Sequence, residues 1–424
     1  MKKKVRKRIV QVYFDANLCK PILVGSLAIE SSHGHEKYFF EYSQDLLKHP
    51  WSFCLNPQLE WFSGKQSLDS FHAVDVFLDS VPDHWGRALL KRREELKAEK
   101  ENGLVPRLLE SDFLLGVADF TRMGAFRFSE DDGKSFLGPD EQCCKMPSVA
   151  DLPRLESMVR FFQMQEHDPG LSELIWLGCS LGGARSKVNV KDEDGFLWIA
   201  KFPSTQDKTN MGAWEKTMID LAVLCQIRVP ETELCLSSLF PNQSIFLTKR
   251  FDRKGQRRIH FVSAMGLLGQ WENQDDEAGY LDLVAFLRSH GSRPREDIQE
   301  LFWRIVFSFA VNNTDDHLRN HGFLLEKQGW TLSPMYDVNP SLEGHESSLC
   351  ITPNNPDYTI ENLLEFARYA DLDQEWASRS IQETCRTVAA NWKRIAYTNG
   401  LTEQQIKKME PAFYRAAQVM ASQK

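Results

Sequence analysis

The sequence lacks the features that assign many chains to a class at first sight. Its 424 residues contain no apolar run as long as the roughly 20 residues that a membrane-spanning helix needs. The basic N-terminus is followed by Val10–Asp15, which alternates as a strand does and is unlike the apolar core of a secretory signal. No internal repeat and no low-complexity tract is present. We therefore expect a cytoplasmic protein with no membrane segment.

Regular cysteine spacing is also missing. The nine cysteines are an odd number, no Cys-x-x-Cys repeat occurs, and Cys143-Cys144 is the only close pair. This pattern indicates neither a disulfide framework nor a zinc site. His317 and His321 lie four residues apart, but no His-Glu-x-x-His motif surrounds them, so we discount a metal site made from these two histidines alone.

An excess of positive charge is absent as well. The net charge of −8 argues against nucleic-acid binding by the chain as a whole. The N-terminus is the exception, with the basic residues Lys2, Lys3, Lys4, Arg6, Lys7 and Arg8. Such an arm could contact phosphates, although a solvated tail that leads into a first strand is the simpler interpretation.

Two units with different patterns are predicted, separated by a linker. Residues 129–146 are rich in Asp, Glu and Gly and have no periodicity, which is typical of a linker. We place an N-terminal α+β domain at 1–130 and a second domain at 147–424. Within the second domain, 147–255 holds a Gly-rich turn and strands, whereas 256–424 is mostly helical.

The expected elements follow from the spacing of apolar residues. In the N-terminal domain we expect strands at Val10–Phe14, Leu23–Ile29, Tyr38–Tyr42 and Met123–Phe128, and a helical region from Phe71. In the second domain we expect a strand pair at 186–190 and 196–202, a helix at Met211–Leu224, a hairpin at 233–248 and another at Gly322–Leu332.

A dense polar cluster ends the most apolar helix that the sequence predicts. The run Leu301–Val311 is long and aromatic enough for a buried helix, and it is followed by Asn-Asn-Thr-Asp-Asp-His-Leu-Arg-Asn at 312–320. A polar loop on a rigid scaffold is typical of a functional site. Asp315 and Asn320 have the separation that kinase catalytic loops use for the Asp that orients the attacking hydroxyl and the Asn that holds a metal ion. Asp316 lacks this spacing, so we expect it to tolerate substitution better.

A Gly-rich turn at 177–187 precedes the strand pair. Gly182 and Gly183 allow a backbone to approach a ligand closely and can turn N–H groups toward phosphate oxygens, but such a turn is weak evidence by itself. It is not a Walker A loop. Lys201 lies on the next strand, where kinases place a lysine on the nucleotide phosphates; an edge-strand lysine is the plain alternative. Glu215 is either its ion-pair partner or an exposed helix residue.

Asp337 follows the hairpin that begins just after Asn320. A short hairpin that returns a carboxylate to the catalytic loop is how kinases deliver a second metal-binding Asp, whereas taken alone Asp337 would be a turn or cap residue. The order of the parts supports the kinase interpretation more than any one of them. Magnesium needs few protein oxygen ligands besides substrate phosphates, so Asn320 and Asp337 would suffice.

With these residues in place, the chain resembles the HipA family of toxin Ser/Thr kinases from bacterial toxin–antitoxin modules. Three segments are specific: Ser-x-x-Gly-Ala-x-x-Lys at 180–187, Thr-Asp-x-His-x-x-Asn at 314–320 and Pro-x-Tyr-Asp at 334–337. Arg-Phe-Asp-Arg at 250–253 and Phe-Leu-Asp-Ser-Val-Pro-Asp at 77–83 are also similar to family segments. The resemblance covers nearly the full length.

The resemblance implies an α+β, two-lobed protein-kinase-like fold with a HipA-type N-terminal domain and a helical C-terminal lobe. ATP and Mg²⁺ would be the cofactors. Asp315 would be the catalytic residue, and Asn320 and Asp337 would hold magnesium. The nucleotide would be bound by Lys201, Phe251, His317, Gly182, Gly183 and Lys187, and Ser180 would be the autophosphorylation site.

The resemblance also implies a biological role. Members of the family phosphorylate aminoacyl-tRNA synthetases and inhibit growth, and phosphorylation of the loop serine switches the kinase off. A small helix-turn-helix antitoxin, similar to HipB, would be the inhibitor and would carry the contact with operator DNA. A catalytically weak corepressor subunit is the alternative function. Asp-x-His-x-x-Asn also resembles the catalytic loop of phosphoinositide 3-kinases, so a lipid substrate is a remote alternative.

Overall fold

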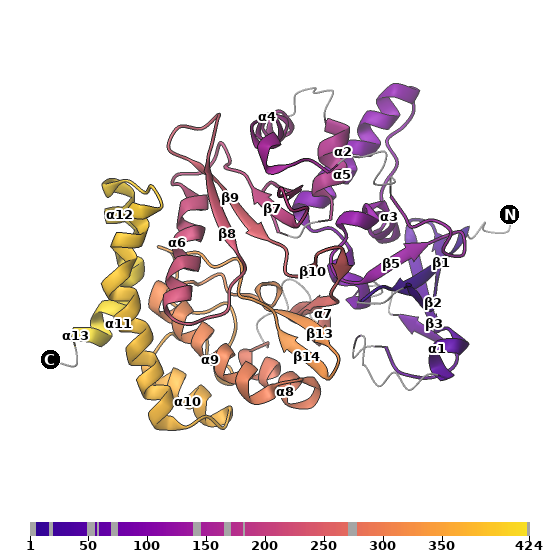
Figure 1. The fold of residues 1–424 in the computed structure, drawn as a ribbon. Coiled ribbons are helices and arrows are strands. Elements are labelled where there is room, and N and C mark those ends of the chain that lie inside the picture. Colours follow the sequence, from indigo (N-terminus) through magenta and orange to yellow (C-terminus); the bar gives the residue numbers. More distant parts are fainter. Residues whose placement is uncertain are drawn as a thin grey trace. The chain divides into compact units, whose positions relative to one another are not determined.

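The computed structural model describes residues 6–16, 20–48, 56, 59–68, 75–138, 146–164, 171–180, 183–269 and 278–421 (Figure 1). Contacts between Cα atoms divide the chain into two compact units, which are described separately. The first unit comprises Met1–Ser204 and Asp252–Val262, and the second comprises Thr205–Phe251 and Ser263–Lys424. The domain boundaries expected at 130 and 147 stay a prediction.

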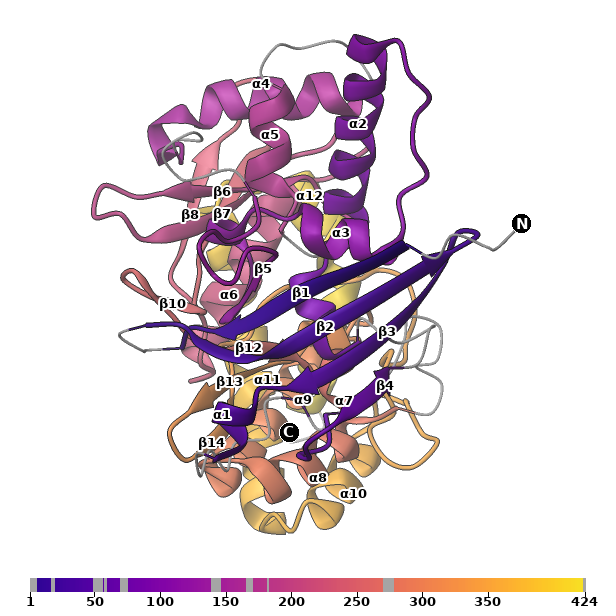
Figure 2. The same cartoon turned by 90° about the vertical axis from the view of Figure 1, so that its right-hand side faces the viewer.

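A five-stranded antiparallel sheet is the core of the first unit (Figure 2). Its order is β4-β3-β2-β1-β5, with β1 (Arg6–Phe14), β2 (Ile22–Ser32), β3 (His35–Tyr42), β4 (Lys65–Leu68) and β5 (Phe126–Ser129). Val10, Val12 and Phe14 are buried and the residues between them are partly exposed, as period-two alternation predicts. The four strands expected here are confirmed, although β1 begins earlier and β5 later than expected.

The other elements of the first unit are α1 (Gln44–Lys48), α2 (His84–Glu101), α3 (Glu110–Gly116), α4 (Leu152–Gln163), α5 (Leu171–Gly178), β6 (Lys187–Lys191), β7 (Leu197–Lys201), β10 (Arg253–Lys254) and β11 (Arg257–Arg258), followed by β12 (Phe261–Ser263) at the unit boundary. The helical region expected from Phe71 is divided, in its described part, into a 3-10 turn and helix α2. Helix α2 begins only at His84, because the Asp83 carboxylate accepts the His84 backbone N–H at 2.7 Å and caps the helix. A 3-10 turn at Asp75–Ser80 precedes it, and residues 71–74 lie outside the described residues.

The second unit is mainly helical. Its elements are α6 (Met211–Leu224), β8 (Thr232–Leu236), β9 (Ser244–Lys249), α7 (Ala264–Leu268), α8 (Tyr280–His290), α9 (Pro294–Val311), β13 (Gly322–Glu326), β14 (Gly329–Leu332), α10 (Ile360–Tyr369), α11 (Gln374–Thr398), α12 (Glu403–Met409) and α13 (Tyr414–Ala421). Helix α11 packs against α6, α9 and α13 (Figure 1). Among the described residues, no helix combines the length and the apolar character needed to cross a membrane.

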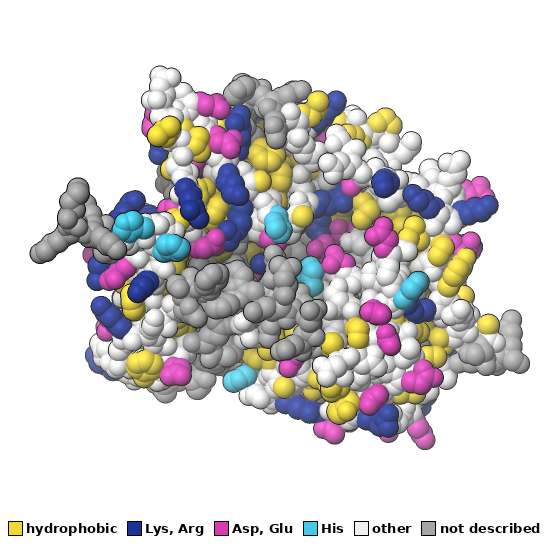
Figure 3. Space-filling model, turned by 180° about the vertical axis from the view of Figure 1, so that it is seen from behind, with side chains coloured by type: hydrophobic (Ala, Val, Ile, Leu, Met, Phe, Trp, Pro, Cys, Tyr) yellow, Lys and Arg dark blue, Asp and Glu magenta, His cyan; other side chains and the backbone are white. Residues whose placement is uncertain are grey.

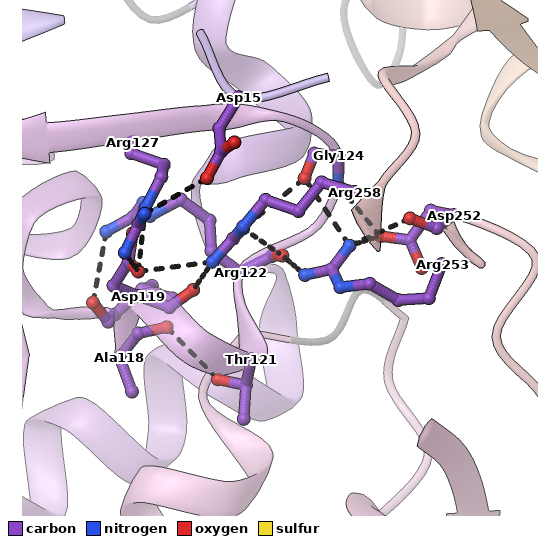
Figure 4. A network of polar contacts seen from close by, with 11 residues as sticks. Asp15, Ala118, Asp119, Thr121, Arg122, Gly124, Arg127, Asp252, Arg253 and Arg258 are labelled. Carbon is purple, nitrogen blue, oxygen red and sulfur yellow. Dashed lines mark hydrogen bonds and ion pairs between the residues drawn. The ribbon is translucent and has the colours of Figure 1, made fainter. Parts of the chain in front are cut away.

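Arginine side chains hold the segment Asp252–Val262 within the first unit (Figure 4). Arg258 donates hydrogen bonds to the backbone oxygen of Asp119 at 2.5 Å and to its Oδ2 at 3.1 Å. Arg253 donates to the backbone oxygen of Arg122 at 2.7 Å. These polar contacts join segments that are more than one hundred positions apart in the sequence.

Asp119 is the central acceptor of this arginine network (Figure 4). Arg127 donates to its Oδ2 at 2.6 Å and also to Asp15 at 3.0 Å. Burial raises the pKa of Asp119, but the guanidinium groups of Arg258 and Arg127 outweigh burial and hold that pKa below its usual range. The carboxylate is therefore ionised at neutral pH, and its ion pairs stabilise the folded unit.

We expect Asp119→Asn to lower the free energy of unfolding at pH 7 by about 3 kcal/mol, because it leaves buried guanidinium groups without their anion. A depressed carboxyl pKa contributes stability above the unfolded pKa of about 3.9 and loses it as the pH falls through the folded pKa. The difference between wild type and variant should therefore be constant from about pH 7 to pH 5 and shrink below about pH 4. Urea denaturation over this pH range measures it; a difference that grows on acidification would contradict the assignment.

Candidate active site

Helix α9 carries the predicted polar cluster at its C-terminal end. The helix stops at Val311, where the sequence predicted its end, and Asn312 caps it in the left-handed conformation with φ 52°. Asn adopts this conformation more readily than most residues. The Asn312 amide donates to the backbone oxygen of Ser341 at 2.7 Å, and its own backbone oxygen accepts the Ser341 N–H at 3.0 Å. These bonds set the direction in which the loop 312–320 leaves the helix.

Asp315 and Asn320 are held together within this loop. The Asn320 amide nitrogen donates to the backbone oxygen of Asp315 at 2.8 Å, across a 3-10 turn at Leu318–Asn320. The side chain of Asp315 is 87% exposed, so its carboxylate can meet a substrate. No described residue donates a hydrogen bond to the Oδ1 of Asn320. The five-residue spacing therefore produces an exposed Asp315 carboxylate on a loop whose backbone is bonded to the buried Asn320 amide.

Asp315 also interacts electrostatically with its neighbours. Partial burial raises its pKa above the ordinary value, and the negative charges of Asp337 and Asp316 add to this rise. His317, whose Nε2 lies 4.0 Å from the Asp315 Oδ1, acts in the opposite direction. Two acidic side chains that disfavour each other's charge are the arrangement that a divalent cation relieves. The structure thus brings Asp315 and Asp337 into one electrostatic site.

Asp337 lies in the segment that follows the β13–β14 hairpin. Asp337 has φ 58°, a left-handed conformation that costs backbone energy at a non-glycine residue and is common at functional sites. The Tyr336 hydroxyl donates to the backbone oxygen of Arg319 at 2.7 Å and so ties this segment to the loop 312–320. Phe251 packs on Tyr336 with ring centroids 5.6 Å apart.

The oxygen atoms at this site fit magnesium. Mg²⁺ prefers oxygen ligands and usually takes one or two carboxylates, with waters and phosphate oxygens completing its shell. Asp337 and Asn320 provide one carboxylate and one amide oxygen, and Asp315 adds negative charge nearby. Within the described part of the chain, no group of three or more His, Cys, Asp or Glu side chains could hold a metal by itself. A magnesium ion held by Asn320 and Asp337 would complete its shell with waters or with the phosphate oxygens of a ligand.

A buried ion pair on α9 supports the segment that leads to Asp337. Arg304 is 2% exposed and donates to Glu300 Oε1 at 2.8 Å and to the backbone oxygen of Ser333 at 2.7 Å. Glu300 also accepts the backbone N–H of Arg228 at 3.1 Å. The same helix therefore positions both acids, Asp315 from its end and Asp337 from its side. The sequence signal for this role was only a Glu and an Arg four residues apart on an apolar helix.

The Gly-rich loop lies in the first unit. Ser180 is 4% exposed, and its hydroxyl accepts a hydrogen bond from the Asn189 amide at 3.2 Å. Gly183 has φ 83°, which suits glycine. Gly182 lies outside the described residues. Lys187 and Lys201 face each other across the β6–β7 pair and are both buried.

The start of α2 contacts both ends of this loop, which sequence patterns did not predict. Asp83 Oδ2 accepts the Gly183 N–H at 2.7 Å, and the Trp85 indole donates to the backbone oxygen of Lys187 at 2.7 Å. A Cβ on Gly86 would lie 2.5 Å from the backbone oxygen of Cys179, so glycine permits this close approach. The segment 77–83, singled out by its resemblance, leads directly into these contacts.

Two expectations about acidic residues change with the structure. Glu215 on α6 is 5% exposed and so is not the exposed helix residue that the plain interpretation assumed. Asp316 is 4% exposed, whereas the expectation that it tolerates substitution assumed no structural role. Neither burial follows from the spacing of these residues, because both depend on which elements pack over them.

Comparison with known proteins places this geometry in a family. A family model described as the HipA-like C-terminal domain matches residues 179–392. The chain is 26% identical over 217 residues to "Putative kinase Y4dM" of Sinorhizobium fredii, covering 47% of this chain and 52% of that protein. It is 26% identical over 205 residues to "Putative kinase Y4mE" of the same species, covering 43% of this chain and 47% of that protein. The chain thus spans about half the length of the curated relatives it matches.

A solved structure shares the fold. A chain from the complex of the Shewanella oneidensis MR-1 toxin–antitoxin system, HipA and HipB with operator DNA, matches with a TM-score of 0.68 and 14% identity. The match covers 97% of this chain and 96% of that chain. At this identity the likeness establishes the fold alone. It confirms the predicted class, an α+β, two-lobed kinase-like fold.

We expect Arg304→Met to lower the free energy of unfolding by about 3 kcal/mol or more, because it leaves the Glu300 carboxylate buried beside an apolar side chain. Arg295→Met is the matched control, since Arg295 is exposed on the same helix, and we expect it to change stability by less than about 0.5 kcal/mol. Urea denaturation of both variants measures the difference. Equal stabilities would show that the buried ion pair does not hold the segment before Asp337.

Proposed function

Because the chain belongs to the family with the HipA-like C-terminal domain, we propose that it is an ATP- and Mg²⁺-dependent Ser/Thr protein kinase. The observations that support this most are the hydrogen bond from Asn320 to the Asp315 backbone and the electrostatic interaction between Asp315 and Asp337. Positioning and charge stabilisation supply most of the catalysis in phosphoryl transfer. A loop that starts at the end of a buried helix and carries an exposed carboxylate suits that chemistry.

Each residue has a proposed role in this reaction. Asp315 accepts the hydrogen bond of the substrate hydroxyl and orients it for attack on the γ-phosphorus of ATP. Asn320 and Asp337 hold Mg²⁺, which neutralises charge on the phosphate oxygens when bound. The proposed nucleotide ligands are Lys201 and Lys187 with their ammonium groups, Gly182 and Gly183 in the Gly-rich loop, and Phe251 and His317 beside the base and phosphates. The raised pKa of Asp315 keeps its carboxylate a better proton acceptor than an ordinary Asp.

We expect Asp315→Asn and Asp337→Asn each to lower phosphoryl transfer at least about 100-fold, because the first loses the hydroxyl acceptor and the second a magnesium ligand. Both variants should fold, since Asn tolerates the left-handed backbone at position 337. Asp371→Asn is the control, because Asp371 is an exposed acid of the same unit. Release of ADP from Mg-ATP measures turnover, and wild-type turnover in either site variant would refute the proposed roles.

Autophosphorylation of Ser180 is the proposed off-switch. Its hydroxyl is buried and bonded to Asn189, so the loop must leave this conformation before a phosphoryl group can be accepted. A phosphate carries close to two negative charges and would not return to this buried place without partners.

We therefore expect protein that carries one phosphoryl group on Ser180 to bind Mg-ATP at least about tenfold more weakly than unphosphorylated protein. Intact mass must establish the phosphorylation state before a calorimetric titration. Ser180→Ala should gain no phosphoryl group at this position and should retain wild-type affinity. Equal affinities of the phosphorylated and unphosphorylated forms would exclude the switch.

The proposed partners follow from the toxin–antitoxin relatives. The matching solved chain comes from a complex of HipA and HipB with operator DNA, and we propose a similar helix-turn-helix antitoxin for this chain. Figure 3 shows Lys, Arg, Asp and Glu side chains on one face of the molecule. We propose that contact with operator DNA runs through the antitoxin. By family resemblance, we propose an aminoacyl-tRNA synthetase as the protein substrate.

A catalytically weak corepressor subunit is the second candidate function. The antitoxin–DNA complex of the matching structure is the observation that favours it. Unphosphorylated protein that bound antitoxin but showed no heat of Mg-ATP binding would support this candidate over the kinase.

A further inference from the structure

Two neighbouring acids of the loop 312–320 lie in opposite environments. The side chain of Asp315 is 87% exposed, whereas that of Asp316 is 5% exposed. A buried carboxylate must be paired or hydrogen-bonded, because desolvation otherwise makes its charge very costly. The contacts of Asp316 therefore show which side chains hold the loop 312–320 in place.

Three side chains from different elements surround the Asp316 carboxylate. The Tyr280 hydroxyl donates to its Oδ2 at 2.6 Å, and the Ser308 hydroxyl donates to the same atom at 3.2 Å. His321 Nε2 lies 3.0 Å from Oδ1. The His321 imidazole lies beside the carboxylate without hydrogen-bond geometry, since neither ring nitrogen has a hydrogen-bond partner among the described residues.

The surroundings favour the ionised form of Asp316. Burial raises its pKa, but the His321 imidazole and the donors Tyr280 and Ser308 outweigh burial and lower that pKa below the usual range. Tyr280 is itself fully buried, and its hydroxyl also lies 3.2 Å from that of Ser347. The carboxylate is thus a buried anion with two hydroxyl donors and an imidazole around it.

These contacts connect the parts that carry the proposed site. Tyr280 begins α8, Ser308 lies on α9 one turn before the loop, and His321 directly precedes β13. The pair Asp316 and His321 brackets the 3-10 turn that ends at Asn320. On the other side of the loop, Asn320 donates to the backbone oxygen of Asp315. The backbone between 315 and 321 is therefore held from two sides.

We propose that Asp316 is the positioning residue of the phosphoryl-transfer loop, which aims Asp315 and Asn320 through its buried contacts with Tyr280, Ser308 and His321. The proposal rests on the kinase function proposed above. Asp316 itself touches neither the substrate nor the nucleotide. Its role is to hold the exposed carboxylate at a fixed place, because a displacement of about 1 Å can lower the rate of an enzyme about 100-fold.

A positioning role predicts a change in kcat that a purely structural role does not. Asp316→Asn keeps the shape of the side chain but removes its charge and one acceptor oxygen. We expect kcat for ADP release from Mg-ATP to fall about 10- to 100-fold, while KM for ATP changes by less than about threefold because the nucleotide contacts remain. Asp119→Asn is the matched control, since it also removes a buried, paired carboxylate but lies outside the proposed machinery. Its kcat should stay within about twofold of wild type.

Tyr280→Phe tests the same contact without changing the loop. It removes only the hydroxyl at 2.6 Å from Asp316, and we expect kcat to fall about three- to tenfold. The double variant Asp316→Asn/Tyr280→Phe should have a kcat within about twofold of that of Asp316→Asn alone. Both substitutions remove the same interaction, so their effects should not add. Tyr397→Phe, at an exposed tyrosine of the same unit, controls for the loss of a hydroxyl. If Asp316→Asn does not fold, the kcat of Tyr280→Phe alone tests the positioning role of Asp316.

The outcomes separate this proposal from the kinase function. Wild-type protein that turns over Mg-ATP, with an inactive Asp315→Asn variant, supports the kinase function. If Asp316→Asn and Tyr280→Phe then keep wild-type kcat, or if Asp119→Asn lowers kcat as much as Asp316→Asn does, the positioning role is refuted and the kinase function stands. Unphosphorylated wild-type protein that binds Mg-ATP but transfers its γ-phosphoryl group neither to Ser180 nor to an added aminoacyl-tRNA synthetase refutes both.

Discussion

The candidate site depends on how the buried helix α9 ends. The last turn of a helix leaves carbonyl groups without helical partners, and burial makes such groups costly unless other donors reach them. Here Asn313 N–H donates back to the Ser308 oxygen at 2.9 Å, and the Tyr358 hydroxyl donates to the Asn313 oxygen at 2.7 Å. Arg415 of α13 donates to the side chain of Asn312. These hydrogen bonds fix the backbone at Asn312 and Asn313, and so they set the direction in which the loop 312–320 leaves helix α9.

Buried ion pairs hold segments together in both units, although removing their charges from water costs free energy. The Glu300–Arg304 pair in the second unit and the Asp119 network in the first are fully paired, which is the condition under which buried charges persist. In both cases an arginine also donates to a backbone oxygen of a distant segment: Arg304 to Ser333 and Arg258 to Arg122. Such contacts join segments that lie far apart in the sequence.

The two neighbouring acids of the loop, Asp315 and Asp316, have different environments and different proposed roles. Asp315 faces solvent with a raised pKa, while Asp316 is buried with a lowered one. Identical side chains thus receive opposite properties from their surroundings, as one carboxylate lies beside another acid and its neighbour beside an imidazole and two hydroxyl groups. A similar principle holds the Gly-rich loop in the first unit, where Asp83 both caps α2 and accepts the Gly183 N–H.

The sequence by itself determined the local elements and the composition of the candidate site. The apolar run to Val311, the helix Met211–Leu224 and the hairpin Gly322–Leu332 follow from periodicity and turn residues, which act over a few positions, and the order of motifs indicated the family. Only the tertiary structure decided that Asp316 and Glu215 are buried, that Arg304 supports the Asp337 segment, and that Trp85 contacts the Gly-rich loop. These properties depend on contacts between residues far apart in the chain, and side-chain spacing carries no information about which elements will meet.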